Sequence, residues 1–290
     1  MPATLTPLRY PGGKTTYTDL FVDIISMNKL ENCTFVEVFA GGAGAAITLL
    51  LKGHVKALFL NDLSVAIYAF WKCVKEQPSD LIDLIQSKRI SMAEWRRQKA
   101  VYDVKDTSDM LALGFATFYL NRCNHSGILE ARPVGGMKQT GTYSISSRYR
   151  KSTSIQKIKA IAEHAESMEV FNLDGAEFVK MLKRKHRDRK FLVYFDPPYH
   201  QKGPALYLNH FSKQDHEALR DIILKCPFPW VLSYDNHEEI IALYRGRRCG
   251  LRRSQIRHTI SGNTNSEELV ISQLSLPGYL ERLHSRSRSR

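Results

Sequence analysis

The sequence lacks the features of membrane-spanning, disulfide-rich and zinc-knuckle proteins. None of its 290 residues falls in an apolar run near the roughly 18 residues that cross a bilayer, and its start has no apolar segment typical of a signal peptide. The five cysteines are widely spread and never form a C-x-x-C pair, which favours reduced structural thiols. These absences predict a soluble cytoplasmic protein without a membrane anchor.

The basic charge is large but unevenly placed. The formal net charge is +13, and residues 132–159 contain seven basic side chains and no acid. Residues 180–190 and 245–290 form two further basic stretches, so the rest of the chain is net acidic. Localised patches indicate a polyanionic partner, although a solvated surface explains any single patch, and charge alone does not separate DNA, RNA and anionic membrane.

Short apolar runs alternate with helical patterns and predict a parallel sheet. The candidate strands are Phe35–Phe39, Ala57–Leu60, Glu169–Asn172, Phe191–Phe195 and Trp230–Tyr234. Strands alternating with helices predict an α/β fold with a doubly wound sheet. Ligands of such sheets bind at the carboxyl ends of the strands, where polar residues follow three of these runs.

The alternation is interrupted between residues 65 and 164. A capping box at Ser91 opens one predicted helix, and a second, strongly apolar helix spans Ser108–Leu120. The segment after Arg122 has no apolar periodicity, which predicts long loops or a hairpin. We therefore expect a discontinuous domain of residues 1–64 and 165–280, a mainly helical insert at 65–164, and a basic disordered tail at 281–290.

A glycine-rich turn follows the first predicted strand. It consists of Phe39, Ala40, Gly41, Gly42, Ala43 and Gly44. Such a turn lets the backbone approach a ligand closely, and Asp62, about 20 residues on, can accept hydrogen bonds from a ribose. The pattern fits an adenosine-containing cofactor, either NAD or S-adenosylmethionine, although the glycines could simply pack a helix on a strand.

The sequence Asp196-Pro197-Pro198-Tyr199 follows an apolar strand directly. Two prolines remove backbone donors and fix φ, which leaves rigid carbonyls free to accept hydrogen bonds. A carboxylate beside a carbonyl can accept both hydrogens of an exocyclic amino group, and a tyrosine ring can stack on the attached base. This loop therefore predicts a site for the amino group of a nucleobase, and the alternative is a simple turn.

Several motifs in a fixed order carry a resemblance to a known family. They are Leu8–Lys14, Phe35–Gly44, Asn61–Asp62, Phe118–Arg122 with Ser126–Ile128, Asn172–Asp174 and Asp196–Tyr199. The chain resembles the DNA adenine methylase family, the D12 class of N6-adenine-specific DNA methyltransferases, over about residues 8–275. The resemblance implies a Rossmann-like methyltransferase sheet with an inserted target-recognition domain. Tyr10 replaces a common tryptophan, and the insert differs enough that GATC specificity is not implied.

The resemblance also implies roles for individual residues. Lys14 would lie near the methionine carboxylate of S-adenosylmethionine, Asp62 at its ribose and Asp174 near its adenine, and S-adenosylhomocysteine would be the product. The implied cofactor residues are Tyr10, Lys14, Glu37, Phe39, Ala40, Gly41, Gly42, Gly44, Asp62, Asp174 and Asp196, and the implied catalytic residues are Asp196, Pro197, Pro198 and Tyr199.

The substrate implied is an adenine flipped out of double-stranded DNA, because the N6 amino group is hidden inside a duplex. The basic part of the insert supplies the expected DNA contacts, namely Arg122, Asn124, Ser126, Arg132, Lys138, Arg148, Arg150 and Lys151. The alternative for each of them is a role in loop structure. Arginines 252, 253 and 257, beside a predicted hairpin, are further candidates.

The sequence also leaves alternative functions open. An RNA adenine or a cytosine N4 is an alternative substrate, and a catalytically silent nucleic-acid-binding module is another. Asp196 with His200 does not supply a metal site, because the prolines prevent a shared helix. Lys14 lacks the spacing of a phosphate loop. We expect no metal, a monomer or weak dimer in a bacterial or phage-infected cell near the nucleoid, and a role in restriction–modification beside a cognate endonuclease, a solitary role or a phage-related one.

Overall fold

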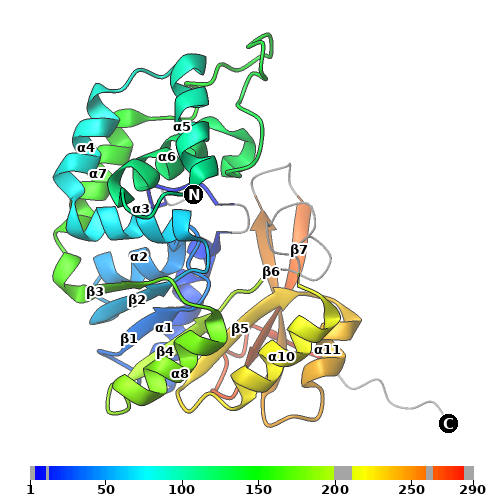
Figure 1. Ribbon diagram of the computed structural model, residues 1–290. Helices are drawn as coiled ribbons and strands as arrows, with labels where there is room; N and C mark the ends of the chain where they lie inside the picture. Colours follow the sequence, from blue (N-terminus) through cyan, green and yellow to red (C-terminus); the bar gives the residue numbers. More distant parts are fainter. Residues whose placement is uncertain (1–3, 11–12, 199–210, 259–263, 284–290) are drawn as a thin grey trace.

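A single mixed sheet organises the computed structural model, which describes residues 4–10, 13–198, 211–258 and 264–283. Its strands are β1 (Thr34–Glu37), β2 (Ala57–Asn61), β3 (Met168–Phe171), β4 (Phe191–Phe195), β5 (Trp230–Asp235), β6 (Gly250–His258), β7 (Thr264–Ser272) and β8 (Glu281–Arg282). Their order is β3-β2-β1-β4-β5-β7-β6-β8 (Figure 1). Strands β1 to β5 pair in parallel, and β7, β6 and β8 add antiparallel partners at one side.

Helices cover both faces of the sheet because alternate strand residues point to opposite sides. Phe35 packs into the core on the face of α1 (Thr18–Met27) and α2 (Gly44–Leu51), whereas Val36 packs into the core on the other face. That other face carries α8 (Gly175–Lys185), α10 (Lys213–Leu224) and α11 (Glu238–Tyr244). The predicted doubly wound, Rossmann-like α/β class is confirmed.

The segment between β2 and β3 forms the helical lobe drawn in cyan to green in Figure 1. It contains α3 (Val65–Glu76), α4 (Pro78–Ser87), α5 (Met92–Val104), α6 (Met110–Cys123), the short helix η2 (His125–Gly127), α7 (Lys151–Ala162) and η3 (Ala165–Ser167). Ser91 caps α5 by accepting a bond from the Glu94 N–H, at the position that the sequence indicates. The lobe shares one hydrophobic cluster with the sheet, so the division into domains at 64/65 and 164/165 stays a prediction.

Two sequence-based expectations are corrected by the backbone. The segment after Arg122 was expected to be loops or a hairpin, but Lys151–Ala162 is helix α7, in which Ile158 and Ile161 are fully buried. The tail expected from residue 281 instead begins with β8, which pairs with β6 through Arg252 and Arg253. The predicted strands are otherwise present, with ends that differ by one or two residues.

The carboxyl ends of the parallel strands face the lobe and carry the site described below. Lys14 begins a short 3-10 helix, η1 (Lys14–Tyr17), which packs beside α2. Among the described residues, none of the helices is long and apolar enough to span a membrane.

Candidate functional site

A pocket of about 360 Å³ opens at the carboxyl ends of the parallel strands. Its lining includes most of the residues that the sequence predicts, namely Tyr10, Lys14, Glu37, Phe39, Ala40, Gly41, Gly42, Gly44, Asp62, Asp174, Asp196 and Pro198. Pro197 is buried but does not line the pocket, and Tyr199 lies outside the described residues. Residues 170 or more positions apart in the chain therefore meet in one cavity of the size that small ligands occupy.

The glycine turn forms the floor of this pocket. Gly41 has a φ of +46°, a conformation that disfavours other residues, and a Cβ placed there would lie 2.8 Å from the Tyr10 ring. Trp71 fixes the same turn from behind by donating its Nε1–H to the Gly41 carbonyl at 2.9 Å. The backbone of the turn therefore lies directly against the Tyr10 ring, and only glycine, which has no side chain, allows this close contact.

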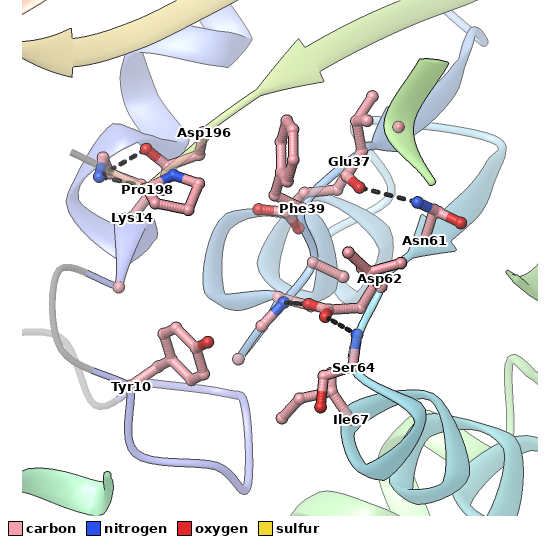
Figure 2. A pocket seen from close by; sticks show the side chains of 18 of the residues that line it. Tyr10, Lys14, Glu37, Phe39, Asn61, Asp62, Ser64, Ile67, Asp196 and Pro198 are labelled. Carbon is pink, nitrogen blue, oxygen red and sulfur yellow. Dashed lines mark hydrogen bonds and ion pairs between the residues drawn. The ribbon is translucent and has the colours of Figure 1, made fainter. Parts of the chain in front are cut away.

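Asp62 joins the glycine turn to the start of α3. Its carboxylate accepts the Gly41 N–H at 2.8 Å and the Ser64 N–H at 2.9 Å, and Figure 2 shows both bonds on the pocket wall. Burial raises the pKa of Asp62 to about 6, opposed by these two backbone bonds. The group is mostly ionised above that pH, and its remaining lone pairs can accept bonds from ligand hydroxyls.

Asp196 is held from behind by a cation and a hydroxyl. Lys14 Nζ lies 3.0 Å from each of its carboxylate oxygens, and the Ser233 hydroxyl donates to Oδ1 at 2.7 Å. Figure 2 shows Lys14 reaching Asp196 at one end of the pocket. Burial raises the pKa of Asp196, whereas Lys14 opposes that shift. Lys14 is expected near the methionine carboxylate; in the structure it lines the pocket and its ammonium group pairs with Asp196.

Glu37 and Asp174 complete the acidic lining. Glu37 is 3% exposed, and burial raises its pKa well above the usual range. Its Oε2 atom has no hydrogen-bond partner among the described residues, which fits a donor supplied by a ligand. Asp174 caps α8 by accepting the Ala176 N–H at 2.8 Å, so it stands at the rim with a lone pair still available.

Several lining residues were not predicted as site residues. Gly127, Ile128, Leu129 and Glu130 of the inserted lobe form one wall, together with Asn61, Leu63, Ser64, Ile67, Leu173, Gly175 and Phe211. A signal existed for four of these, because Asn61, Gly127, Ile128 and Leu173 belong to motifs that carry the family resemblance. None of the others belongs to such a motif.

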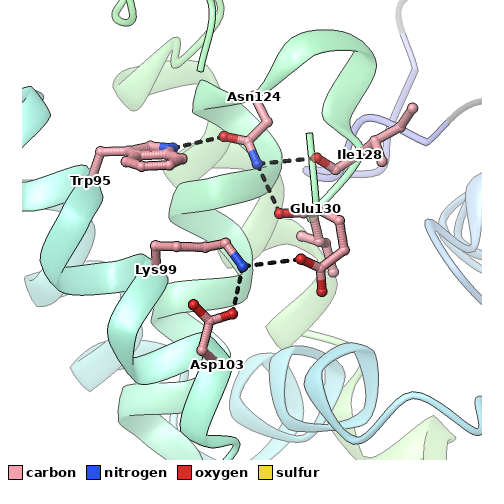
Figure 3. A network of polar contacts seen from close by, with 7 residues as sticks. Trp95, Lys99, Asp103, Asn124, Ile128 and Glu130 are labelled. Atoms are coloured by element: carbon pink, nitrogen blue, oxygen red, sulfur yellow. Dashed lines mark hydrogen bonds and ion pairs between the residues drawn. The ribbon is translucent and has the colours of Figure 1, made fainter. Parts of the chain in front are cut away.

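Two residues expected to contact DNA are inside the protein, and for them the expectation is corrected. The Arg122 guanidinium donates to the carbonyls of Pro7, Arg148 and Tyr149. Asn124 is fully buried, accepts the Trp95 Nε1–H at 2.7 Å, and donates to the carbonyls of residues 128 and 129 at 3.0 and 2.9 Å (Figure 3). Both side chains would have to break these bonds to reach DNA.

The same lobe carries an ion pair beside the pocket. Lys99 on α5 lies 3.0 Å from the Glu130 carboxylate and also pairs with Asp103, as Figure 3 shows. Glu130 belongs to the pocket wall. The wall is therefore fastened to α5 at two points, by Asn124 through Trp95 and by Glu130 through Lys99.

The other predicted DNA contacts are mostly at the surface. Arg132, Lys138, Arg148 and Arg150 are exposed, which is compatible with phosphate contacts. Ser126 is half-buried, with a positive φ of 54°. The remaining residue is Lys151, whose Nζ donates to the carbonyls of residues 86 and 88 at the C-terminal end of α4. The described residues contain no group of three potential metal ligands.

Comparisons with known proteins found a matching family model and similar proteins. A sequence model described as "D12 class N6 adenine-specific DNA methyltransferase" matches residues 10–259. The curated Type II methyltransferase M.MjaIII of Methanocaldococcus jannaschii is 22% identical over 223 residues, covering 72% of this chain and 73% of that protein. The crystal structure of SMU.776 complexed with SAH aligns at a TM-score of 0.39 and 11% identity, over 87% of this chain. This chain spans about half of that structure's length, since the alignment covers 48% of it.

Proposed function

Because the chain belongs to the D12 class of N6 adenine-specific DNA methyltransferases, we propose that it methylates N6 of a specific adenine in double-stranded DNA with S-adenosylmethionine as donor. The observation that carries this proposal is the placement of Asp196. Its carboxylate lines the cofactor pocket, is anchored by Lys14, and is followed by two prolines that leave the Pro197 carbonyl without a neighbouring backbone donor.

The pocket residues fit this cofactor on their own chemistry. The glycine turn accommodates close backbone contact, Asp62 can accept ribose hydroxyls, and the unpartnered oxygen of Glu37 can accept an ammonium hydrogen. Asp174 at the rim can accept from an adenine amino group. Bound S-adenosylmethionine would supply a sulfonium-activated methyl group, and the protein residues would supply orientation.

Asp196 is the group proposed to act on the target base. The lone pair of adenine N6 is delocalised into the ring, which makes the amino group a poor nucleophile. Hydrogen bonds from N6 to an Asp196 oxygen and to the Pro197 carbonyl favour a pyramidal nitrogen whose lone pair can attack the methyl group. The proton need not leave before transfer. Methylated N6 takes over the positive charge of the sulfonium and then releases a proton to solvent, so Asp196 need not be a strong base.

The target base must leave the duplex to reach this site, at a cost of a few kcal/mol. We propose that exposed arginines and lysines of residues 132–150 bind the phosphates on either side, and that Tyr199 stacks on the flipped adenine. A cytoplasmic location and a paired restriction endonuclease remain predictions from the sequence.

Incubation of the purified protein with methyl-labelled cofactor and duplex DNA, followed by nucleoside analysis, tests the proposal. Label in N6-methyladenine is the expected result. Label only in N4-methylcytosine or only in RNA would favour the corresponding alternative, and DNA retention without any transfer would favour a silent binding module. Activity should survive EDTA, because no step of the mechanism uses a metal.

A further inference from the structure

A second buried acid lies behind Asp196, on a strand that carries none of the expected site residues. Glu268 of β7 is 1% exposed, and its Oε2 lies 3.6 Å from Lys14 Nζ. Tyr17 donates its hydroxyl to the same oxygen at 3.1 Å. Lys14 therefore stands between two carboxylates, bidentate on Asp196 and more distant from Glu268.

The combined charge of Lys14, Asp196 and Glu268 determines how strongly Asp196 can accept a hydrogen bond. With one lysine shared by two ionised carboxylates, the trio has a net charge of one negative. A Lys14–Asp196 pair alone would be neutral, and a carboxylate fully matched by a cation is a weaker acceptor for a third partner. Interactions between buried charges are strengthened by the low local dielectric, so this difference acts strongly at the end of the pocket.

We propose that Glu268 is a positioning residue for methyl transfer, which holds Lys14 against the back of Asp196 and leaves the trio net negative beside the target amino group. The inference rests on the proposed function and adds a residue to it. Positive charge develops on N6 as the methyl group is transferred, and a fixed negative trio stabilises that charge without moving. Ser233 completes the support, since it fixes Oδ1 and is itself bonded to the Tyr194 hydroxyl at 2.7 Å.

The titratable groups around Asp196 give this arrangement a pH signature. They are Lys14 and Tyr17 of η1, Glu37 of β1, Tyr194 of β4, Tyr234 of β5 and Glu268 of β7. Asp235 of β5 is opposite Glu268 in the β5–β7 ladder. Glu268 raises the pKa of Asp196 by repulsion, whereas Lys14 lowers it. Removing the Glu268 charge therefore lowers the pKa of Asp196, because the repulsion between the two carboxylates disappears.

The test is the Glu268→Gln variant, measured as a single-turnover rate of methyl transfer across pH. Two changes are expected together: a plateau rate lower by about tenfold, for a lost interaction of about 1.4 kcal/mol, and an acid limb displaced to lower pH. The dissociation constants for cofactor and DNA should change by less than about threefold, because neither ligand touches Glu268.

Matched variants separate this role from a structural one. Glu268→Asp keeps the charge and should keep the acid limb near its wild-type position. Glu267→Gln removes a neighbouring carboxylate that is exposed and accepts from Asn236, so it should leave rate and profile unchanged. A thermal melt of each variant shows whether folding is affected.

The proposal is overturned if Glu268→Gln has the wild-type plateau and limb, or if its plateau falls without any displacement of the limb and with a lowered melting temperature. If the wild-type protein transfers no methyl group under saturating cofactor and DNA, the proposed function fails and this inference fails with it. If the wild-type protein is active and Glu268→Gln has the same rate and pH profile, only this inference is contradicted.

Discussion

The two regions that meet at the pocket both bury polar side chains, but they use them differently. At the carboxyl ends of the strands these groups are charged, and Lys14 pairs with both Asp196 and Glu268. At the end of α6 they are amides. Asn121 bonds the backbone of Arg9 and Gly127, and Asn124 donates to the carbonyls of residues 128 and 129 in the pocket wall. The first arrangement shifts the pKa of the Asp196 carboxylate, whereas the second fixes the course of the chain.

Buried polar residues therefore have two different roles in this protein. A buried carboxylate near a cation has a chemical state that its neighbours can shift. A buried amide bonded to backbone has no such state and contributes by satisfying carbonyls that would otherwise be stranded. Arg122 belongs to the second kind despite its charge, because its partners are carbonyls, and burial lowers its pKa only to about 10, which leaves it protonated.

The largest effect is expected where the strand ends lose the Asp196 carboxylate. Asp196→Ala should reduce methyl transfer by at least about 10²- to 10³-fold, because it removes the acceptor that orients N6. DNA affinity, measured by fluorescence anisotropy, should stay within about threefold of wild type, since the exposed basic residues are untouched. A variant with a tenth or more of the wild-type rate would contradict the mechanistic assignment.

Substitutions in the amide region should lower the free energy of unfolding more than they lower methyl transfer. Asn124→Asp exchanges two donated bonds for a carboxylate facing the same carbonyls, and should lower the free energy of unfolding by about 3 kcal/mol. The control is Asn32→Asp, the same change at an exposed position with a positive φ of 58°, expected within about 0.5 kcal/mol of wild type. Urea unfolding measures both variants, and equal midpoints would show that the Asn124 bonds to the carbonyls of residues 128 and 129 do not stabilise the fold.

The glycine turn can be tested with a pair of equivalent glycines. Gly41→Ala places a Cβ 2.8 Å from the Tyr10 ring and displaces the pocket wall. Cofactor affinity, measured by calorimetry, should fall about tenfold, which is about 1.4 kcal/mol of binding free energy. Gly53 also has a positive φ, of +72°, but nothing lies within 4 Å of an added Cβ, so Gly53→Ala should lower stability alone. Unchanged affinity in Gly41→Ala would show that the Tyr10 contact does not shape the pocket.

The smallest effect concerns the exposed charges of the lobe. Arg132→Ala should weaken DNA binding a few-fold and reduce the slope of log affinity against log salt by about one. Arg184→Ala removes an exposed arginine at the end of α8 and should change neither quantity. Equal slopes for the two variants would mean that DNA does not contact the lobe through Arg132.

The sequence predicts the parts of this molecule that are local. Strand β4 followed by Asp196, the glycine turn after β1 and the cap at Ser91 each occupy a few consecutive residues whose chemistry is readable without the fold. The helix α7 was missed because its apolar residues are few and lie among basic and small ones, so packing decides its existence.

Long-range contacts were the harder part. Tyr17 and Glu268 are 251 positions apart, and nothing in either neighbourhood of the sequence marks them as hydrogen-bond partners. Asn124 was misassigned because a polar residue beside an arginine looks like a surface pair in sequence, whereas its burial depends on how α5 packs on α6. Such assignments require the three-dimensional arrangement.

The most direct test of the account is a map of modified bases in genomic DNA. Wild-type protein and Asp196→Ala should be expressed at equal levels in cells without their own adenine methylation, and the DNA sequenced for N6-methyladenine. We predict N6-methyladenine at one short recurring sequence with the wild-type protein and none with the variant. Its absence in both, or equal amounts in both, would contradict the assignment of this pocket as the site of DNA adenine methylation.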